Sequence, residues 1–184
     1  YVYCNCWSYQ NRIIKIDTET DEVVASLTVG IQPTSLVIDR YDRLWTITNG
    51  GYAGSPYGYE EPALHRIDLE TFSVDATYRF TLGDSPSEIC INGAGDRLYW
   101  INDAVWEMDV TATSLPVRPF LVSRDTKYYG LTVAPVSGEV YVADAIDYQQ
   151  QGMIYRYTPD GQLIDEFYTG ITPGAFCWKV DGYK

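Results

Sequence analysis

Apolar and polar residues alternate along most of the chain, in short runs that are separated by tight polar turns. Three segments share one pattern, in which an alternating run enters a polar turn and continues into a run rich in aromatic and branched residues. They begin at Pro33, Pro86 and Tyr128, and the opening of the pattern returns at Pro173. Apolar residues at every second position indicate β-strands, so each segment predicts a β-hairpin.

A second hairpin follows each copy of the first, and Asp17 and Asp68 begin two of the turns in this second series. The combined pattern advances by 53, 42 and 45 residues from one copy to the next. Four strands in each repeat of about 40–45 residues, with no helical periodicity, are typical of β-propeller blades. A β-sandwich also alternates short strands, but it does not require a four-strand pattern to recur.

We therefore expect an all-β domain over residues 1–184, a β-propeller with about four blades of four antiparallel strands. Blade boundaries are predicted near residues 32, 85, 127 and 172, and residues 173–184 align with the first strand of a closing blade. Tyr1 aligns with the second strand of a blade. A chain that starts on the second strand of a blade and ends on a first strand is compatible with a closed four-bladed ring, and equally with the C-terminal part of a larger ring.

Antiparallel strands place successive connections on opposite faces of such a disc. One face receives only short turns, and the other receives every insertion. The inserted connections lie at residues 5–11, 49–62, 123–129 and 144–152. The second of these contains GGYAGSPYGYEEP, which carries far more aromatic surface than a plain connector needs.

Aromatic and amide side chains are therefore expected to gather on one face and to bind a ligand there. Tyrosine offers a large apolar plate with a polar tip, and glutamine offers an uncharged donor and acceptor. Alternatively, some of the tyrosines cap the core and the glutamines are simply solvated. The predicted ligand-binding residues are Trp7, Tyr9, Tyr52, Tyr57, Tyr59, Lys127, Tyr128, Tyr129, Asp147, Tyr148, Gln149 and Gln150.

The charge of the chain narrows the choice of partners. The net charge is −12 and the isoelectric point is near 4.3. An acidic surface repels phosphate backbones and anionic lipid headgroups, which argues against nucleic acid and membrane surfaces as partners. No apolar run is long enough to predict a transmembrane segment. Four cysteines match no zinc-binding spacing and are expected as buried or half-buried strand thiols.

Catalytic chemistry is missing from the sequence. The only histidine, His65, lies on a predicted strand and is expected to be structural, away from the inserted loops. No metalloprotease, phosphate-binding-loop or serine-hydrolase motif occurs. We therefore expect no catalytic residue and no resident cofactor. A carboxylate-only metal centre is the alternative, for which the loops between blades supply Asp84 and Asp125.

Several stretches resemble a known family. The segment NRIIKIDTETDEVVASLTVGIQPTSLVID resembles the repeat of YVTN-type (YncE-like) surface propellers. Within that group the chain is most similar to the surface propellers of gut anaerobes that accompany outer-membrane cobalamin transporters. The stretches GGYAGSPYGYEEPALHRID, RDTKYYGLTV, VYVADAIDYQQQGMIYRY and GAFCWK support this resemblance.

The resemblance implies a non-enzymatic lipoprotein with seven blades, anchored at the cell surface. Such proteins capture vitamin B12 and pass it to an outer-membrane transporter. This chain would then be the C-terminal part of the ring, and its ligand cobalamin or a related corrinoid. Two alternatives remain open from the sequence, a protein-interaction scaffold of the cell surface and a metal-dependent propeller hydrolase or lyase.

Overall fold

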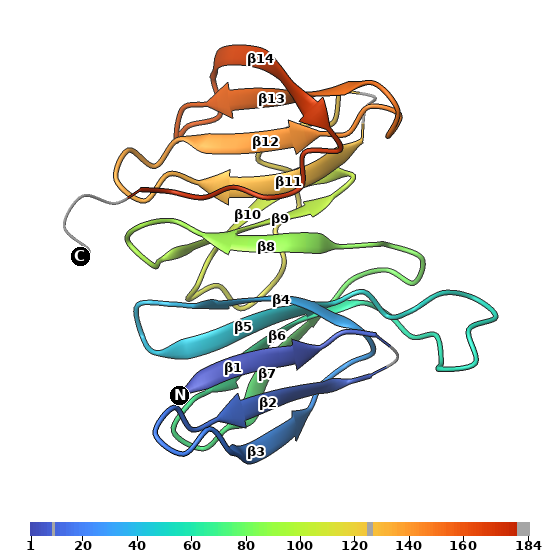
Figure 1. Cartoon of the computed structure of the whole chain (residues 1–184), viewed down its shortest axis with the longest axis vertical. Helices are drawn as coiled ribbons and strands as arrows, with labels where there is room; N and C mark the ends of the chain where they lie inside the picture. The colour runs from blue at the N-terminus through green and yellow to red at the C-terminus, as the bar shows by residue number, and fades with distance from the viewer. Residues whose placement is uncertain (9, 125–126, 180–184) are drawn as a thin grey trace. The chain divides into compact units, whose positions relative to one another are not determined.

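A computed structural model describes residues 1–8, 10–124 and 127–179 (Figure 1). Fourteen strands and no helix occur among these residues, which confirms the all-β prediction. The strands are β1 (Val2–Cys6), β2 (Arg12–Ile16), β3 (Val23–Thr28), β4 (Pro33–Ile38), β5 (Arg43–Thr48), β6 (Ala63–Asp68), β7 (Ser73–Arg79), β8 (Ser87–Ile91), β9 (Arg97–Asn102), β10 (Ala104–Asp109), β11 (Tyr128–Val133), β12 (Val140–Asp144), β13 (Gln151–Tyr157) and β14 (Leu163–Ile171).

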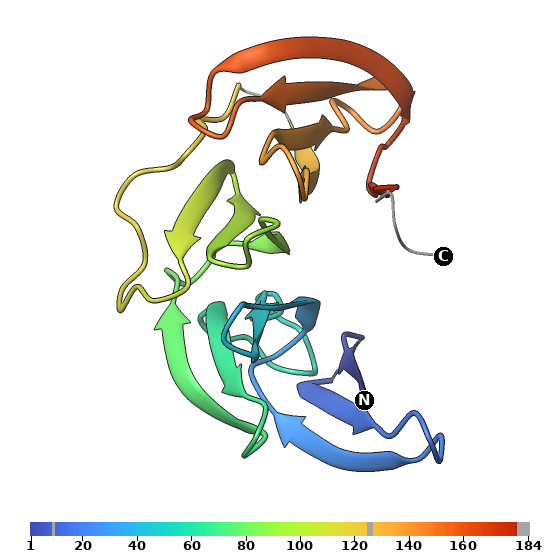
Figure 2. The same cartoon turned by 90° about the vertical axis from the view of Figure 1, so that its left-hand side faces the viewer.

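The strands form four antiparallel sheets in chain order: β1-β2-β3, β4-β5-β6-β7, β8-β9-β10 and β11-β12-β13-β14. Figure 2 shows β11 to β14 following one another across their sheet, with the long β14 last. The chain divides into two compact units. The first comprises Tyr1–Ile89 with Val110–Leu115, and the second comprises Cys90–Asp109 with Pro116–Lys184.

Apolar side chains on alternate strand positions build the core of each unit. In the first unit Ile13, Leu44 and Ile67 form one cluster from three strands. In the second unit a larger cluster includes Val140, Val142 and Tyr155 of β12 and β13. Successive residues of β5 are buried, so both faces of this strand are covered, as expected for a strand inside a blade.

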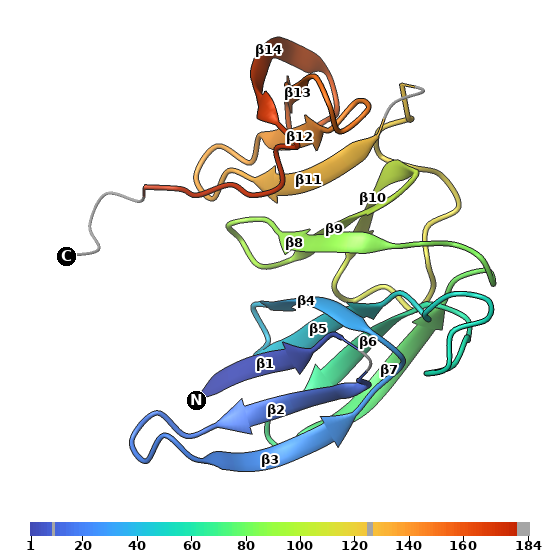
Figure 3. The same cartoon turned by 45° about the vertical axis from the view of Figure 1, so that its right-hand side comes forward.

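The connections obey the predicted alternation within each unit. Figures 1 and 3 show the long connection between β5 and β6 at the same end of the first unit at which β1 ends and β2 begins. In the second unit β12 ends, and β11 and β13 begin, at one end of their sheet. The short turns lie at the other end in both units.

Two predicted strands are absent. After β10, where a fourth strand was expected, the chain makes only an isolated bridge between Val105 and Leu121. Pro116 and Pro119 lie in this segment and lack the N–H that a strand ladder needs.

The second absent strand is the one predicted to begin at Pro173, because residues 173–179 contain no strand and residues 180–184 lie outside the description. Side chains hold this segment instead. The Trp178 indole donates to the Thr132 hydroxyl and lies 5.1 Å from the ring of Tyr141, centroid to centroid. The expectation of a regular strand over 173–179 was therefore wrong.

Candidate functional site

The β5–β6 connection folds back on itself rather than spreading as an open loop. Asn49 Oδ1 accepts a hydrogen bond from the backbone N–H of Gly51, and Gly51 pairs with Tyr59 across an isolated bridge. Gly50 and Gly51 have φ of 76° and 77°, which residues with a Cβ rarely adopt. A Cβ on Gly50 would also overlap the Glu60 carbonyl oxygen. The glycines therefore permit a tight return that presents the tyrosines.

Glu60 anchors this connection to the segment that links the first two sheets of the unit. Its Oε1 accepts a 2.6 Å hydrogen bond from the backbone N–H of Ile31 in the β3–β4 connection. The side chains of Tyr52, Tyr57 and Tyr59 remain exposed. The aromatic surface is thus carried by a pinned segment, which lowers the entropy cost of holding it in one shape.

The β1–β2 connection contributes a further exposed aromatic residue, Trp7. The other aromatic residue predicted there, Tyr9, lies outside the described residues. The neighbouring Gln10 uses its side-chain oxygen to accept two hydrogen bonds from the Arg12 guanidinium. In the first unit, then, the predicted ligand-binding residues that are described all present their side chains to solvent.

Tyr129 and Tyr148 form the corresponding aromatic surface of the second unit. Their rings meet edge to face with centroids 5.6 Å apart, while the side chains stay 41% and 50% exposed. Tyr148 has a φ of 63°, in a region that bulky residues avoid. The surrounding loop must therefore impose this conformation, as is common at functional sites.

Asp144 and Asp147 impose that loop conformation. The fully buried Asp144 accepts hydrogen bonds through Oδ1 from the backbone N–H groups of Ile146 and Lys127, so it joins both loops. Asp147 Oδ1 accepts from the backbone N–H groups of Gln149 and Gln150. The hydrogen bond from the Gln150 backbone N–H, followed by the one from Gln149, lowers the pKa of Asp147 below its usual value.

Four predicted residues remain, and one of them, Tyr128, differs from expectation. Tyr128 is only 9% exposed and belongs to the core of the second unit, because β11 begins at this residue and directs alternate side chains inward. The expectation that it lies on the loop surface was wrong. Lys127 and Gln149 are exposed, whereas the Gln150 side-chain amide donates to Asp147 Oδ2.

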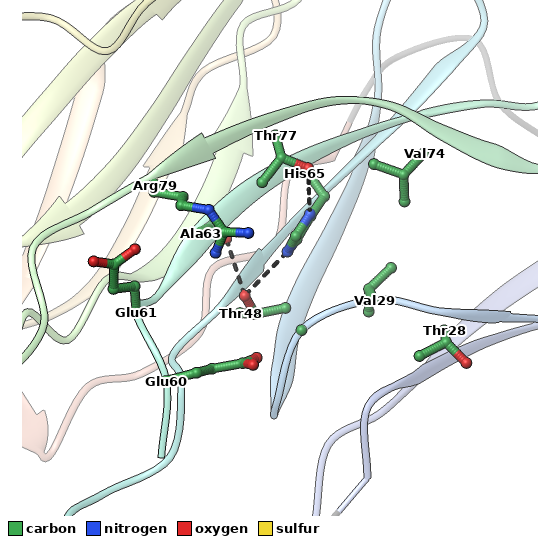
Figure 4. Close-up of a pocket in the computed structure, with 11 residues that line it drawn as sticks. Thr28, Val29, Thr48, Glu60, Glu61, Ala63, His65, Val74, Thr77 and Arg79 are labelled. Atoms are coloured by element: carbon green, nitrogen blue, oxygen red, sulfur yellow. Dashed lines mark hydrogen bonds between the residues drawn. The ribbon is translucent and has the colours of Figure 1, made fainter. Parts of the chain in front are cut away.

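His65 also differs from expectation. It lies on β6, yet it lines a recess of about 290 Å³ together with Glu60 and Glu61 from the β5–β6 connection (Figure 4). The expectation that it lies away from the inserted loops was therefore wrong. The alternation of side chains offered a signal, because His65, Thr77 and Arg79 share one face of the β6–β7 pair.

The hydrogen bonds of His65 determine its tautomer. Thr48 Oγ1 donates its single proton to the Ala63 carbonyl, so it must accept from Nε2–H of His65 at 3.2 Å. Nδ1 then accepts from the Thr77 hydroxyl, also at 3.2 Å. Burial, and next the positive charge of Arg79, lower the pKa of His65 to about 4. Both ring nitrogens are occupied, as in a structural histidine.

Metal-ligating side chains are scattered. In the part of the chain that the structure describes, no group of three or more His, Cys, Asp or Glu residues could hold a metal ion. Asp125, one of the two carboxylates considered for such a centre, lies outside that part. Cys4, Cys6 and Cys90 are half-buried, and Cys177 is exposed after the last strand. Among the described residues no helix is long and apolar enough to cross a membrane.

No family model matches the chain, and no curated protein matches it in sequence. The fold nevertheless resembles solved structures. Hydrazine synthase of Kuenenia stuttgartiensis aligns with a TM-score of 0.69 at 12% identity, over 87% of this chain and 44% of that chain. A quinonprotein alcohol dehydrogenase-like protein of Bacteroides thetaiotaomicron aligns with a TM-score of 0.69 at 14% identity, over 91% and 43%.

A third similar structure comes from a nidogen/laminin complex, with a TM-score of 0.59 at 16% identity over 86% of this chain and 58% of that chain. These likenesses confirm the propeller fold. The chain spans less than half the length of the first two matches. Because enzymes and a protein complex share the fold at such low identity, the likeness identifies the architecture and leaves the activity open.

Proposed function

We propose that the chain belongs to a non-enzymatic binding protein of the cell surface that captures cobalamin or a related corrinoid. The observation that carries this proposal is the exposed Tyr129–Tyr148 pair. Hydrogen bonds to the carboxylates of Asp144 and Asp147 hold the loop that carries Tyr148. A solvent-exposed aromatic pair in a strained backbone is costly to maintain for stability alone. It suits a ligand that needs a rigid apolar platform.

The chemistry of a corrinoid matches the groups presented at this pair. A corrin is large and flat and is fringed with amides. Aromatic plates can cover its face, while the exposed amide of Gln149 and the carbonyl oxygen of Gln150 can meet its amide fringe. In the first unit Trp7, Tyr52 and Tyr57 offer the same kind of surface.

The resemblance of GGYAGSPYGYEEPALHRID and VYVADAIDYQQQGMIYRY to the cobalamin-binding surface propellers supports the same ligand. Under this proposal the whole protein is lipid-anchored on the outer membrane and hands the corrinoid to a transporter. YVTN-type membership is part of the proposal, and the blades of this chain would supply part of the binding face.

Calorimetric titration with cyanocobalamin tests the proposal. We expect saturable heat with the unmodified protein and at least tenfold weaker binding for Tyr148→Ser and Tyr129→Ser. Tyr41→Ser is the matched control, because Tyr41 is equally exposed but lies in the short turn between β4 and β5. Absence of heat at micromolar cyanocobalamin, or an equal loss with Tyr41→Ser, would contradict the proposal.

A protein-interaction scaffold is the second candidate. The similar structure from a nidogen/laminin complex shows that this fold is compatible with protein partners. Exposed Trp and Tyr side chains are also the residues that dominate protein interfaces. A pull-down that depends on Tyr52 and Tyr57, together with no response to cyanocobalamin, would favour the scaffold over the corrinoid carrier.

A further inference from the structure

A recess in the first unit carries charged groups that the corrinoid proposal does not use. It lies between the end of β3 and the sheet formed by β5, β6 and β7 (Figure 4). Its polar lining includes Thr48, Glu60, Glu61, His65, Thr77 and Arg79. Its volume of about 290 Å³ is suited to a small metabolite rather than a corrinoid.

The floor of the recess is fixed and uncharged. His65 is 8% exposed and both of its ring nitrogens are hydrogen-bonded to threonine hydroxyls, which locks the imidazole in one orientation. Thr48 is fully buried and donates to the Ala63 carbonyl. Because these groups are already paired, they shape the recess and leave recognition to the groups at its mouth.

The mouth carries opposite charges that do not neutralise each other. Arg79 and Glu61 are both exposed and line the same recess, yet within the described part of the chain neither side chain forms a hydrogen bond or an ion pair. Glu60 uses Oε1 to bind the Ile31 N–H, which leaves its other carboxylate oxygen available. A guanidinium therefore faces the recess beside two carboxylates.

We propose that this recess binds a small aliphatic α-amino acid, with the ligand carboxylate at Arg79 and its ammonium group at Glu61. The apolar side chains of Val29, Ala63 and Val74 also line the recess and receive the aliphatic side chain of the ligand. Arg binds carboxylates through paired N–H donors, and a charged hydrogen bond is stronger than a neutral one.

The arrangement of these charges favours a zwitterion over simpler ligands. A simple carboxylate would pair with Arg79 but would meet the repulsion of Glu60 and Glu61. A simple amine would pair with the carboxylates but would meet the repulsion of Arg79. Only a ligand with both charges close together satisfies both sides. The site shares no residue with the Tyr129–Tyr148 platform, so either proposal can fail without the other.

Three matched ligands test the proposal on the unmodified chain by calorimetry. L-leucine carries both charges, 4-methylpentanoate lacks the ammonium group, and 3-methylbutylamine lacks the carboxylate. We expect leucine to bind at least about tenfold more tightly than either analogue. Equal binding of leucine and 4-methylpentanoate, or no leucine binding at about 10 mM, would overturn the proposal.

Two variants assign the charges. Arg79→Gln should weaken leucine binding about tenfold but should not weaken the binding of 3-methylbutylamine, which loses only a repulsion. Glu61→Gln should likewise weaken leucine binding but should not weaken the binding of 4-methylpentanoate. Glu22→Gln and Arg118→Gln are the controls, because both residues are exposed and neither lines the recess. Both side chains are exposed, so both variants should fold. Leucine binding that survives both Arg79→Gln and Glu61→Gln would refute the assignment.

Discussion

The ring of Tyr129 meets the ring of Tyr148 edge to face, at an interplanar angle of 85°. The two residues come from different segments, one at the start of β11 and the other in the β12–β13 connection. Asp144 joins these segments by accepting hydrogen bonds from a backbone N–H in each. A buried carboxylate thereby sets the geometry of an exposed aromatic pair.

Asp147→Ala should loosen the β12–β13 connection without affecting the core. The Asp147 carboxylate accepts the backbone N–H groups of Gln149 and Gln150, and alanine cannot replace this acceptor. Hydrogen exchange of these two amides should become faster, and cyanocobalamin binding should weaken if Tyr148 must be held. Asp160→Ala, in the opposite turn of the same blade, is the control. Unchanged exchange at both amides would show that Asp147 does not hold the loop.

Gly50→Ala should destabilise the fold, by about 1–3 kcal/mol. Gly50 has a φ of 76°, and its added Cβ would overlap the Glu60 carbonyl. Gly54 is a matched control, because its φ is 87° but nothing lies within 4 Å of its added Cβ. Thermal unfolding should therefore show a larger loss for Gly50→Ala than for Gly54→Ala. Equal losses would mean that backbone strain, rather than the close contact, sets the cost.

The recurrence of a four-strand pattern made the architecture predictable from the sequence, because strand periodicity is a local property. The pattern could not reveal that Tyr128 turns inward, since this depends on the residue at which β11 begins. Nor could it reveal the segment 173–179, whose apolar alternation matches a strand but which is held by Trp178 and Tyr141 side chains. A strand forms only where a neighbouring strand accepts its backbone hydrogen bonds, and the sequence of the segment alone does not specify that neighbour.

The sequence did carry a signal for the position of His65. His65 follows Tyr59 of the inserted loop by only six residues and lies near the sheet end where the inserted loops are. Ala63 begins β6, so His65 is only two positions from that end. Residues on one sheet face are neighbours at every second position, and the same rule applied to β7 places Arg79 on the face that carries His65.

Asp144→Asn should be tolerated or should stabilise the protein by about 1 kcal/mol. Asp144 Oδ1 accepts two backbone N–H groups, but the buried Oδ2 has no hydrogen-bond partner. Asparagine keeps the accepting oxygen, and the removal of a buried negative charge offsets the cost of the unpaired N–H groups that it places at the Oδ2 position. Asparagine also stands at the same position of another blade, Asn49. Asp144→Ala should instead be destabilising, because both N–H groups lose their acceptor. Urea unfolding compares the two, and equal destabilisation would indicate that Oδ2 binds an ordered water.

His65 should make the stability of the protein depend on pH between about 4 and 6.5. Its pKa is about 4 in the folded protein and 6.5 when the side chain is free in water, so between these values the unfolded chain binds a proton that the folded chain rejects. Stability should therefore be full above pH 6.5 and should fall as the pH drops towards 4. The shift corresponds to about 3 kcal/mol.

The variant His65→Gln isolates this contribution, because glutamine can hydrogen-bond to Thr48 and Thr77 without titrating. Urea unfolding of both proteins at pH 7 and at pH 4 gives the comparison. Acidic groups also titrate over this range, but carboxylates such as Asp68, whose pKa is lowered by the hydrogen bond from the Thr71 backbone N–H, contribute equally to both proteins and cancel. The variant should be less stable than the unmodified protein at pH 7, and the gap should close or reverse at pH 4. A gap that is the same at both pH values would mean that the folded protein accepts the proton on His65, and that the recess is more open to water than its burial indicates.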